Sequence, residues 1–454
     1  MIDQVSGPGR AKVPFPAGGG SDALPRHALP PADFDGLSSG VGSAAAVRRL
    51  RDAEQSVNRA VITRALAGQA DVWREIVRLD EAGAGGLDEV FAHPYARSWA
   101  ARRLDARPVP GMIEAGDEYA AAIAVAGTLR SGGSVSLVTE VKKGVVFLPT
   151  VGTLAVGGGA RPVWITTRPD GTAIVRVGDR DYRIGLTERV QDSGSWLPRR
   201  RLESADLTVW LEDSDPYRDG CALPVTERLR DDQVRRWRER FAQAVGYLAD
   251  ALPEHLAAMR AGLTTVTPLM PHPDGHPMSA TARNAFGAIS VALPADGPAL
   301  AQLLVHEFQH TKLGALLDLF DLFDVDDDGR YYAPWRDDPR PLEGLLQGSY
   351  AYLAVTDFWR VRRLTASGAE ARIAQEQFAR WRVQTSEAID VMLRSGALTA
   401  LGERFVRGMA EKASSWSAER VDPAAARAAL DQARDHRAAW DRRGTVGRTA
   451  GGAS

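Results

Sequence analysis

Two adjacent stretches decide the fold of the second half of the chain. Residues 285–294 read AFGAISVALP, and residues 299–320 read ALAQLLVHEFQHTKLGALLDLF. The first stretch is rich in apolar and β-forming residues and ends just before Gly297-Pro298, which predicts a strand followed by a helix that begins near Ala299. The second stretch is apolar on nearly all of its faces, which is typical of a helix buried inside a protein.

The buried helix carries two histidines at a spacing that suits a metal ion. His306 and His310 are four residues apart in the motif HEFQH, so both imidazoles project from one helix face. Glu307 lies beside them, where in a hydrolase it would polarise a metal-bound water. Two unpaired histidines would be costly to bury, which favours a metal site over two unrelated residues. A strand followed by such a helix is also the order in which zinc-metallopeptidase folds place their edge strand and active-site helix.

A third protein ligand is needed, because two histidines alone rarely retain a metal. Asp318 and Asp321 continue the same helix away from the histidines, whereas Glu343 begins the next apolar helix, 33 residues after His310. We expect Glu343 to be the third ligand; the alternative is an ordinary first-turn glutamate stabilised by the helix dipole. Gln347 lies one turn later on the same face and is expected to contact a ligand or the substrate, or else to be a buried helix amide.

A loop with three prolines lies just before Glu343. Residues 332–341 read YAPWRDDPRP, and the prolines restrict the backbone that carries Arg336 and Arg340. A rigid loop with two arginines suits a bidentate clamp on the carboxylate of an acidic substrate or cosubstrate. The alternative is that both arginines pair with neighbouring aspartates of the loop.

Composition excludes several classes of protein. The 454 residues carry a net charge of −2, which gives no electrostatic reason to expect binding to nucleic acid or to an anionic membrane. No run of 18 apolar residues is present to span a membrane, and the first residues lack the apolar run of a signal peptide, so we expect a cytoplasmic protein. The single cysteine excludes an internal disulfide and a cluster of thiolate metal ligands.

The predicted fold class is α+β and mainly helical, with a small antiparallel sheet and a zincin-like core made of one strand and the HExxH helix. We expect a disordered segment over residues 1–40, followed by a helical region over 41–130. A β-rich region with a turn-rich connector follows over 131–220. The metal-binding catalytic region is expected over 221–395, and the C-terminal helices and tail over 396–454.

The motifs together resemble a known family. Besides HEFQH, they include KLGAL at 312–316, the loop at 332–341, LQGSYA at 346–351 and DFW at 357–359. In this combination the chain resembles the actinobacterial HExxH-motif peptide-modification proteins, over about residues 30 to 440. That family accompanies gene clusters for ribosomally made, post-translationally modified peptides. Its members are regarded as iron(II)- and 2-oxoglutarate-dependent peptide β-hydroxylases.

The resemblance implies a cofactor, a cosubstrate and partners. Two histidines and a carboxylate with open positions are the ligand set of non-haem iron oxygenases. The resemblance therefore implies Fe(II), 2-oxoglutarate and O2, with a precursor peptide as substrate and other maturation enzymes of the cluster as possible partners. Arg336 and Arg340 could hold the distal carboxylate of 2-oxoglutarate, and Glu307 would then orient a ligand histidine or a water. Two alternatives stay open: a zinc metallopeptidase with Glu307 as general base, and a catalytically silent peptide-binding domain.

Overall fold

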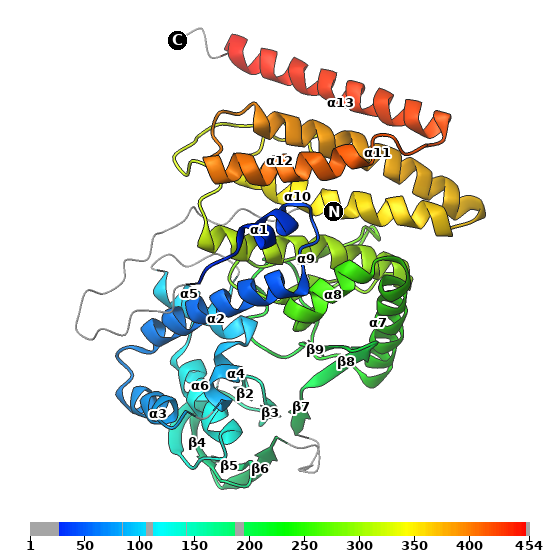
Figure 1. Cartoon of the computed structure of the whole chain (residues 1–454). Coiled ribbons are helices and arrows are strands. Elements are labelled where there is room, and N and C mark those ends of the chain that lie inside the picture. Colours follow the sequence, from blue (N-terminus) through cyan, green and yellow to red (C-terminus); the bar gives the residue numbers. More distant parts are fainter. Residues whose placement is uncertain (1–26, 84, 106–111, 142, 187–194, 451–454) are drawn as a thin grey trace.

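The computed structural model describes residues 27–83, 85–105, 112–141, 143–186 and 195–450 (Figure 1). Helices dominate this described part of the chain, and three small sheets complete it, which confirms the predicted mainly helical α+β class. The helices are α1 (Pro31–Ser38), α2 (Ala44–Leu66), α3 (Ala70–Glu81), α4 (Gly86–Phe91), α5 (Pro94–Leu104), α6 (Asp117–Arg130), α7 (Asp231–Ala251), α8 (Pro253–Gly262), α9 (Gly297–Leu319), α10 (Leu342–Thr365), α11 (Gly368–Leu393), α12 (Ala400–Ser415) and α13 (Pro423–Ala450).

The strands belong to two antiparallel sheets and one mixed sheet. They are β1 (Ser136–Val141), β2 (Val145–Leu148), β3 (Gly152–Ala155), β4 (Arg161–Thr167), β5 (Thr172–Val177), β6 (Arg180–Gly185), β7 (Trp196–Pro198), β8 (Arg200–Ser204), β9 (Leu207–Leu211), β10 (Thr265–Pro268), β11 (Ser279–Ala280) and β12 (Ala288–Val291).

The N-terminal segment is more ordered than its composition predicts. Residues 1–26 lie outside the described residues, but α1 is a helix, so the expectation of disorder over 1–40 is wrong for this part. Phe34 and Leu37 of α1 are buried in the core that α1 shares with α12 and α10. The hydroxyl of Tyr350 on α10 also donates a hydrogen bond to the carbonyl of Leu37. Two apolar side chains one turn apart are thus enough to anchor a segment rich in proline and glycine.

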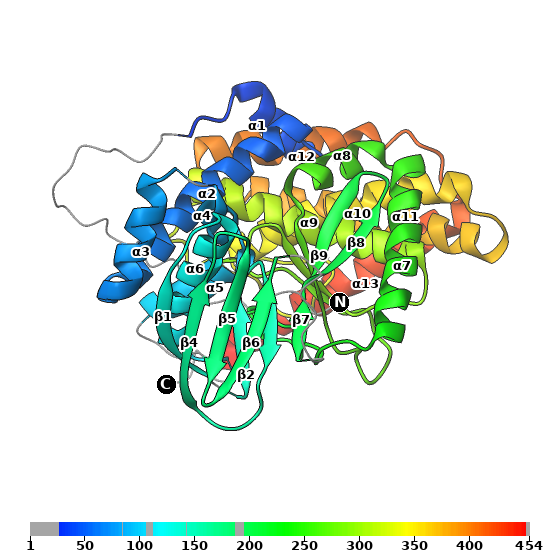
Figure 2. The ribbon, with the colours of Figure 1, turned by 90° about the horizontal axis from the view of Figure 1, so that it is seen from below.

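The β-rich region forms two sheets where one was expected. The first has the order β1-β4-β5-β6 and the second the order β2-β3-β7, with antiparallel pairing throughout. Along β4, Val163 and Ile165 are buried and Trp164 between them is exposed, which is the period of a half-buried strand. The buried side chains pack on α6 and its neighbouring helices, on the side of the sheet away from the viewer in Figure 2.

The mixed sheet positions the HExxH helix. Its order is β11-β12-β10-β9-β8, in which β9, β10 and β12 run parallel and β11 pairs antiparallel with β12. The predicted strand followed by a buried helix is present as β12 and α9. However, β12 is not the edge strand of this sheet, because β11 pairs along its outer side. Asp296 caps α9 by accepting a hydrogen bond from the Ala299 backbone N–H, and Pro298 occupies the first turn.

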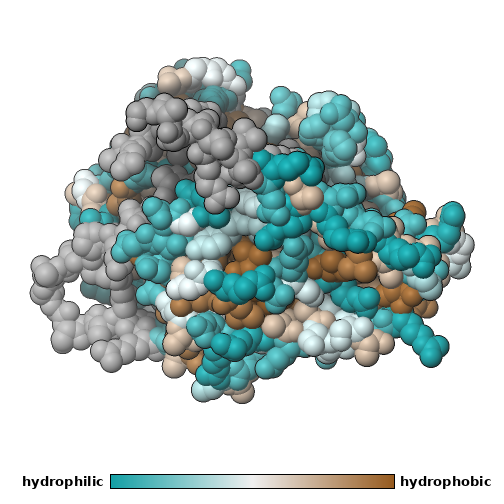
Figure 3. Space-filling model, turned by 90° about the horizontal axis from the view of Figure 1, so that it is seen from above, coloured by the Kyte–Doolittle hydropathy of each residue, from teal (hydrophilic) through white to brown (hydrophobic). Residues whose placement is uncertain are grey.

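The C-terminal helices form the other side of the molecule. In Figure 1, α10, α11, α12 and α13 lie above α9, and α13 is outermost. The face of the molecule seen from above is mostly hydrophilic, with separate hydrophobic patches (Figure 3). None of the helices in the described part of the chain has both the length and the apolar character that crossing a membrane requires.

Candidate metal site on helix α9

The two histidines of α9 meet at their ring nitrogens. The Nε2 atoms of His306 and His310 are 3.2 Å apart, and the ring centroids are 5.0 Å apart. Two nitrogens that bind one tetrahedral metal ion at about 2.0–2.1 Å lie about 3.3 Å from each other. The side chains are buried, with residue exposures of 2% and 6%. The pair is therefore arranged as two ligands of one metal ion, inside the protein.

Gln347 fixes the orientation of His310. Its Oε1 lies 3.0 Å from His310 Nδ1, and the amide itself is buried on α10. When Nδ1 carries the proton and donates to this oxygen, Nε2 keeps its lone pair for a metal ion. Gln347 therefore lies where a residue that supports a ligand is expected.

His306 is kept neutral by its surroundings. Burial lowers the pKa of His306 to about 4, and the neighbouring carboxylate of Glu307 opposes this shift without cancelling it. A neutral imidazole is the form that binds a metal ion. The ring of Tyr352 on α10 contacts the His306 ring edge to face, with centroids 5.3 Å apart. Both imidazoles are thus oriented by side chains of α10.

Glu307 is held on the sheet side of the site. Its Oε1 accepts a hydrogen bond of 2.7 Å from the Ser279 hydroxyl of β11, and its Oε2 accepts one of 2.8 Å from the Thr281 hydroxyl. Oε1 is also 4.0 Å from Nε2 of His306. The carboxylate therefore flanks the metal position, but both of its oxygens already accept hydrogen bonds from the protein.

Glu343 is not brought to the histidines, contrary to the expectation that it completes the ligand set. His310 lies beside Gln347, and His306 lies beside Tyr352, so α9 and α10 run antiparallel across the site. Glu343 precedes Gln347 by four residues and lies about 6 Å further along α10, past His310 and away from His306. Within the described ranges, no group of three or more histidine, cysteine, aspartate or glutamate side chains is close enough to hold a metal ion.

The two loop arginines pair with an aspartate of their own loop. Arg336 Nε donates to Asp338 Oδ1 at 2.8 Å, and Arg340 Nη1 lies 3.8 Å from Asp338 Oδ2. The hydrogen bond from Arg336 lowers the pKa of Asp338 below its ordinary value. The structure therefore has the neighbouring-aspartate arrangement that the sequence left open as the alternative to a clamp. Asp318 is similarly occupied, by Arg97 and Arg283.

The sequence analysis missed several residues of the site. Ser279 and Thr281 hold Glu307, but they precede it by 28 and 26 residues, and only strand pairing brings them close. Tyr352 gave a weak signal, because it lies five residues after Gln347 in a helix that was already singled out. Trp335 lies in the predicted loop beside Arg336, and its contact with Tyr352 was not predicted from the sequence.

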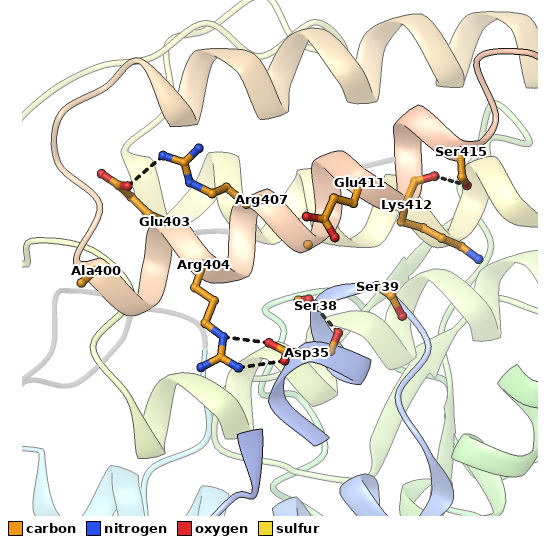
Figure 4. A pocket seen from close by; sticks show the side chains of 11 residues that line it. Asp35, Ser38, Ser39, Ala400, Glu403, Arg404, Arg407, Glu411, Lys412 and Ser415 are labelled. Atoms are coloured by element: carbon orange, nitrogen blue, oxygen red, sulfur yellow. Dashed lines mark hydrogen bonds and ion pairs between the residues drawn. The ribbon is translucent and has the colours of Figure 1, made fainter. Parts of the chain in front are cut away.

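One hollow of the described structure lies away from this site. It has a volume of about 590 Å³ and lies between α1 and α12 (Figure 4). Four of the charged side chains in it form two ion pairs: Arg404 binds Asp35 through two hydrogen bonds, and Arg407 binds Glu403. None of the histidine-site residues lines this hollow.

The chain matches no known protein-family model and no curated protein sequence. What the described fold and site define is a mainly helical α+β protein with a buried pair of histidines whose Nε2 atoms are 3.2 Å apart.

Proposed function

We propose that the protein is an iron(II)- and 2-oxoglutarate-dependent oxygenase that β-hydroxylates a residue of a ribosomally made precursor peptide. The observation that supports this proposal is the pair of Nε2 atoms 3.2 Å apart, with Gln347 behind His310. Iron(II) with 2-oxoglutarate would supply the oxidising chemistry: 2-oxoglutarate is split into succinate and CO2, one atom of O2 enters a C–H bond of the substrate, and the other enters succinate. The set of motifs that resembles the peptide β-hydroxylases favours this chemistry over the other reactions that a two-histidine metal site can support.

Each residue of the site has a defined task in this proposal. His306 and His310 would be two protein ligands of the metal ion, and Gln347 would keep the second in its metal-binding tautomer. Glu307, held by Ser279 and Thr281, fixes β11 to α9 beside the metal position. The low exposure of both histidines limits bulk water at the metal, which protects an oxidising reaction from side reactions.

Arg336 and Glu343 are the residues to test for binding of the cosubstrate and of the metal ion. For Arg336 to hold 2-oxoglutarate, the distal carboxylate must replace Asp338, whose carboxylate group has the same chemistry. Because Glu343 forms no metal-binding group with the two histidines among the described residues, we expect Glu343→Ala to weaken iron binding by less than about threefold. A loss of more than about a hundredfold would instead show that α10 shifts when metal binds.

The deciding experiment is a titration of 2-oxoglutarate into anaerobic protein loaded with one equivalent of iron(II). We expect a weak visible charge-transfer band that saturates at one cosubstrate per iron. The band is expected to vanish in His306→Ala and in His310→Ala, because each removes a ligand. His272→Ala is the matched control, since His272 lies on an exposed loop, and this variant should keep the band. Iron-loaded protein without any band would rule out chelation of the keto acid and the proposal with it.

A zinc metallopeptidase is the second candidate, and one observation favours it. Glu307 Oε1 lies 4.0 Å from His306 Nε2, which places a carboxylate where a general base must act on metal-bound water. Under this candidate, zinc-loaded protein cleaves peptides without O2, and Glu307→Gln abolishes cleavage. The hydroxyls of Ser279 and Thr281 count against it, because they engage both carboxylate oxygens.

A further inference from the structure

A chain of aromatic rings extends from the histidine pair. Tyr352 contacts the His306 ring and stacks on Trp381 of α11, with centroids 4.1 Å apart and ring planes 11° apart. On another side, Trp335 contacts the Tyr352 ring at a centroid distance of 4.7 Å. Tyr352 and Trp381 are buried, whereas Trp335 is only half-buried. Trp335 is therefore the member of this trio that reaches toward solvent beside the site.

Trp335 lies directly over the turn of α10 that supports the histidines. A Cβ atom on Gly348 would be 2.6 Å from ring atom Cζ2 of Trp335, so the indole packs on the bare backbone of this glycine. Gly348 follows Gln347, which holds His310, and precedes Tyr352, which contacts His306. The indole thus packs on the part of α10 that carries Gln347 and Tyr352, the two residues that orient the imidazoles.

The loop that carries Trp335 is fixed on both sides. The Pro334 carbonyl accepts a hydrogen bond of 3.0 Å from Gln384 Nε2 of α11. The Tyr332 hydroxyl forms a 2.8 Å hydrogen bond with His436 Nδ1 of α13, and the Tyr332 ring also contacts Trp440. A ring held by prolines and by two helices loses little conformational entropy when a ligand packs against it, which is a property of binding surfaces.

We propose that Trp335 is a specificity-determining residue that receives an apolar, preferentially aromatic, side chain of the peptide substrate next to the metal position. The inference rests on the proposed function in so far as that function brings a peptide to this site. The charge pattern supports an uncharged side chain, because Arg336 is engaged by Asp338 and Arg380 lies over the Trp381 ring at 4.9 Å. An indole face offers such a side chain a flat, rigid contact.

The test measures binding of acetylated, amidated pentapeptides Gly-Gly-Xaa-Gly-Gly, with Phe, Ala or Asp as Xaa. Saturation-transfer NMR with the full chain gives the dissociation constants, once without added metal and once with one equivalent of zinc. We expect the Phe peptide to bind about 10- to 100-fold more tightly than the Ala peptide, and the Asp peptide to bind no better than the Ala peptide.

Variants at Trp335 separate this contact from a general loss of structure. Trp335→Ala is expected to bring the Phe and Ala peptides within twofold of each other, whereas Trp335→Phe keeps most of the preference. Trp73→Ala removes an exposed tryptophan on α3 and should leave the preference unchanged. Equal binding of Phe and Ala peptides to the unaltered protein overturns the inference, as does an unchanged preference in folded Trp335→Ala. Failure of the iron and 2-oxoglutarate titration is a separate result, because peptide binding is measured without either.

Discussion

Two buried polar clusters of this protein differ in how their polar groups are satisfied. One is the histidine site of α9. The other is the acidic turn that follows β9 and contains Glu212, Asp213 and Asp215, all exposed by 2% or less. The sequence predicts this second stretch only as a turn-rich connector, and the structure instead makes it an anchor between the β-rich region and the helices.

Every carboxylate of the acidic turn is matched by donors. Asp213 accepts hydrogen bonds from Arg200, Arg228 and the Leu229 backbone N–H at 2.7–3.0 Å. Asp215 lies 2.8 Å from His93 Nε2 and accepts a hydrogen bond from the Tyr119 hydroxyl.

Glu212 shows the same balance in its pKa. Burial favours its neutral form, but Arg199, His93 and backbone N–H groups outweigh burial and keep the pKa of Glu212 below its ordinary value. A buried charge that is neutralised in this way serves the fold.

The histidine site is built differently from the charge-paired carboxylates of the acidic turn. Two imidazole nitrogens of the same kind face each other, with their Nε2 atoms 3.2 Å apart. Two lone-pair donors aimed at one point have a purpose when a cation occupies that point. The comparison teaches that buried polarity indicates function where like groups converge, and indicates structure where opposite charges pair.

The largest effect is expected from breaking the acidic turn. Asp213→Ala leaves Arg200 and Arg228 without their buried carboxylate, which should lower the free energy of unfolding by about 3–5 kcal/mol. Chemical denaturation followed by circular dichroism measures this change. Asp88→Ala removes an exposed partner of Arg59 and should change stability by less than about 1 kcal/mol. Similar small losses in both variants would contradict the structural role of the turn.

A second effect is expected from Gln347→Leu at the histidine site. Losing the acceptor for His310 Nδ1 should weaken metal binding about 10- to 100-fold, or about 1.4–2.7 kcal/mol. Competition of zinc with a chromogenic chelator gives the affinity. Gln347→Glu keeps an acceptor at this place and should retain the affinity. If Gln347→Leu binds zinc as tightly as the unaltered protein, the contact does not support a ligand.

The pH dependence of stability tests the same pairing of opposite charges at another buried carboxylate, Asp357 of α10. Burial raises its pKa, but hydrogen bonds and charges from His255 and Arg360 outweigh burial and bring the pKa to about 2. Because the folded pKa lies below the unfolded value, the ionised form stabilises the fold above about pH 4, and this stability is lost as the pH falls toward 2. The loss should be about 2 kcal/mol.

Asp357→Asn is the variant that isolates this contribution. Its stability should fall less steeply between pH 4 and pH 2 than that of the unaltered protein, in urea denaturation at constant ionic strength. Parallel curves for the two proteins would mean that Asp357 is not the group that titrates.

The smallest effect is expected at Arg336, whose partner Asp338 is about half exposed. Solvent screens such a pair, so Arg336→Gln should change the free energy of unfolding by less than about 1 kcal/mol. If Arg336 also holds 2-oxoglutarate, the same variant should lower the affinity for 2-oxoglutarate by about tenfold or more in the charge-transfer titration. Unchanged cosubstrate affinity would remove Arg336 from the proposed site.

The fold was predictable where local pattern decides it. The long apolar stretches at 299–320 and from Glu343 onward predict α9 and α10 closely, and both helices are observed. The histidine pair was equally predictable, because a spacing of four residues on one helix sets the distance between the two side chains. Gln347 also lies as anticipated, since it shares a face of α10 with the other residues that approach α9.

Only the tertiary structure decided the rest. Glu343 carries the right chemistry, but the antiparallel packing of α10 on α9 carries it past His310, and no sequence pattern states the register between two helices. Ser279 and Thr281 reach Glu307 because β11 pairs with β12, which is a contact between distant parts of the chain. The sequence by itself determined which side chains could bind a metal ion, because helix geometry is local. Which partners surround them depended on how helices and strands pack, because packing is set by the whole core.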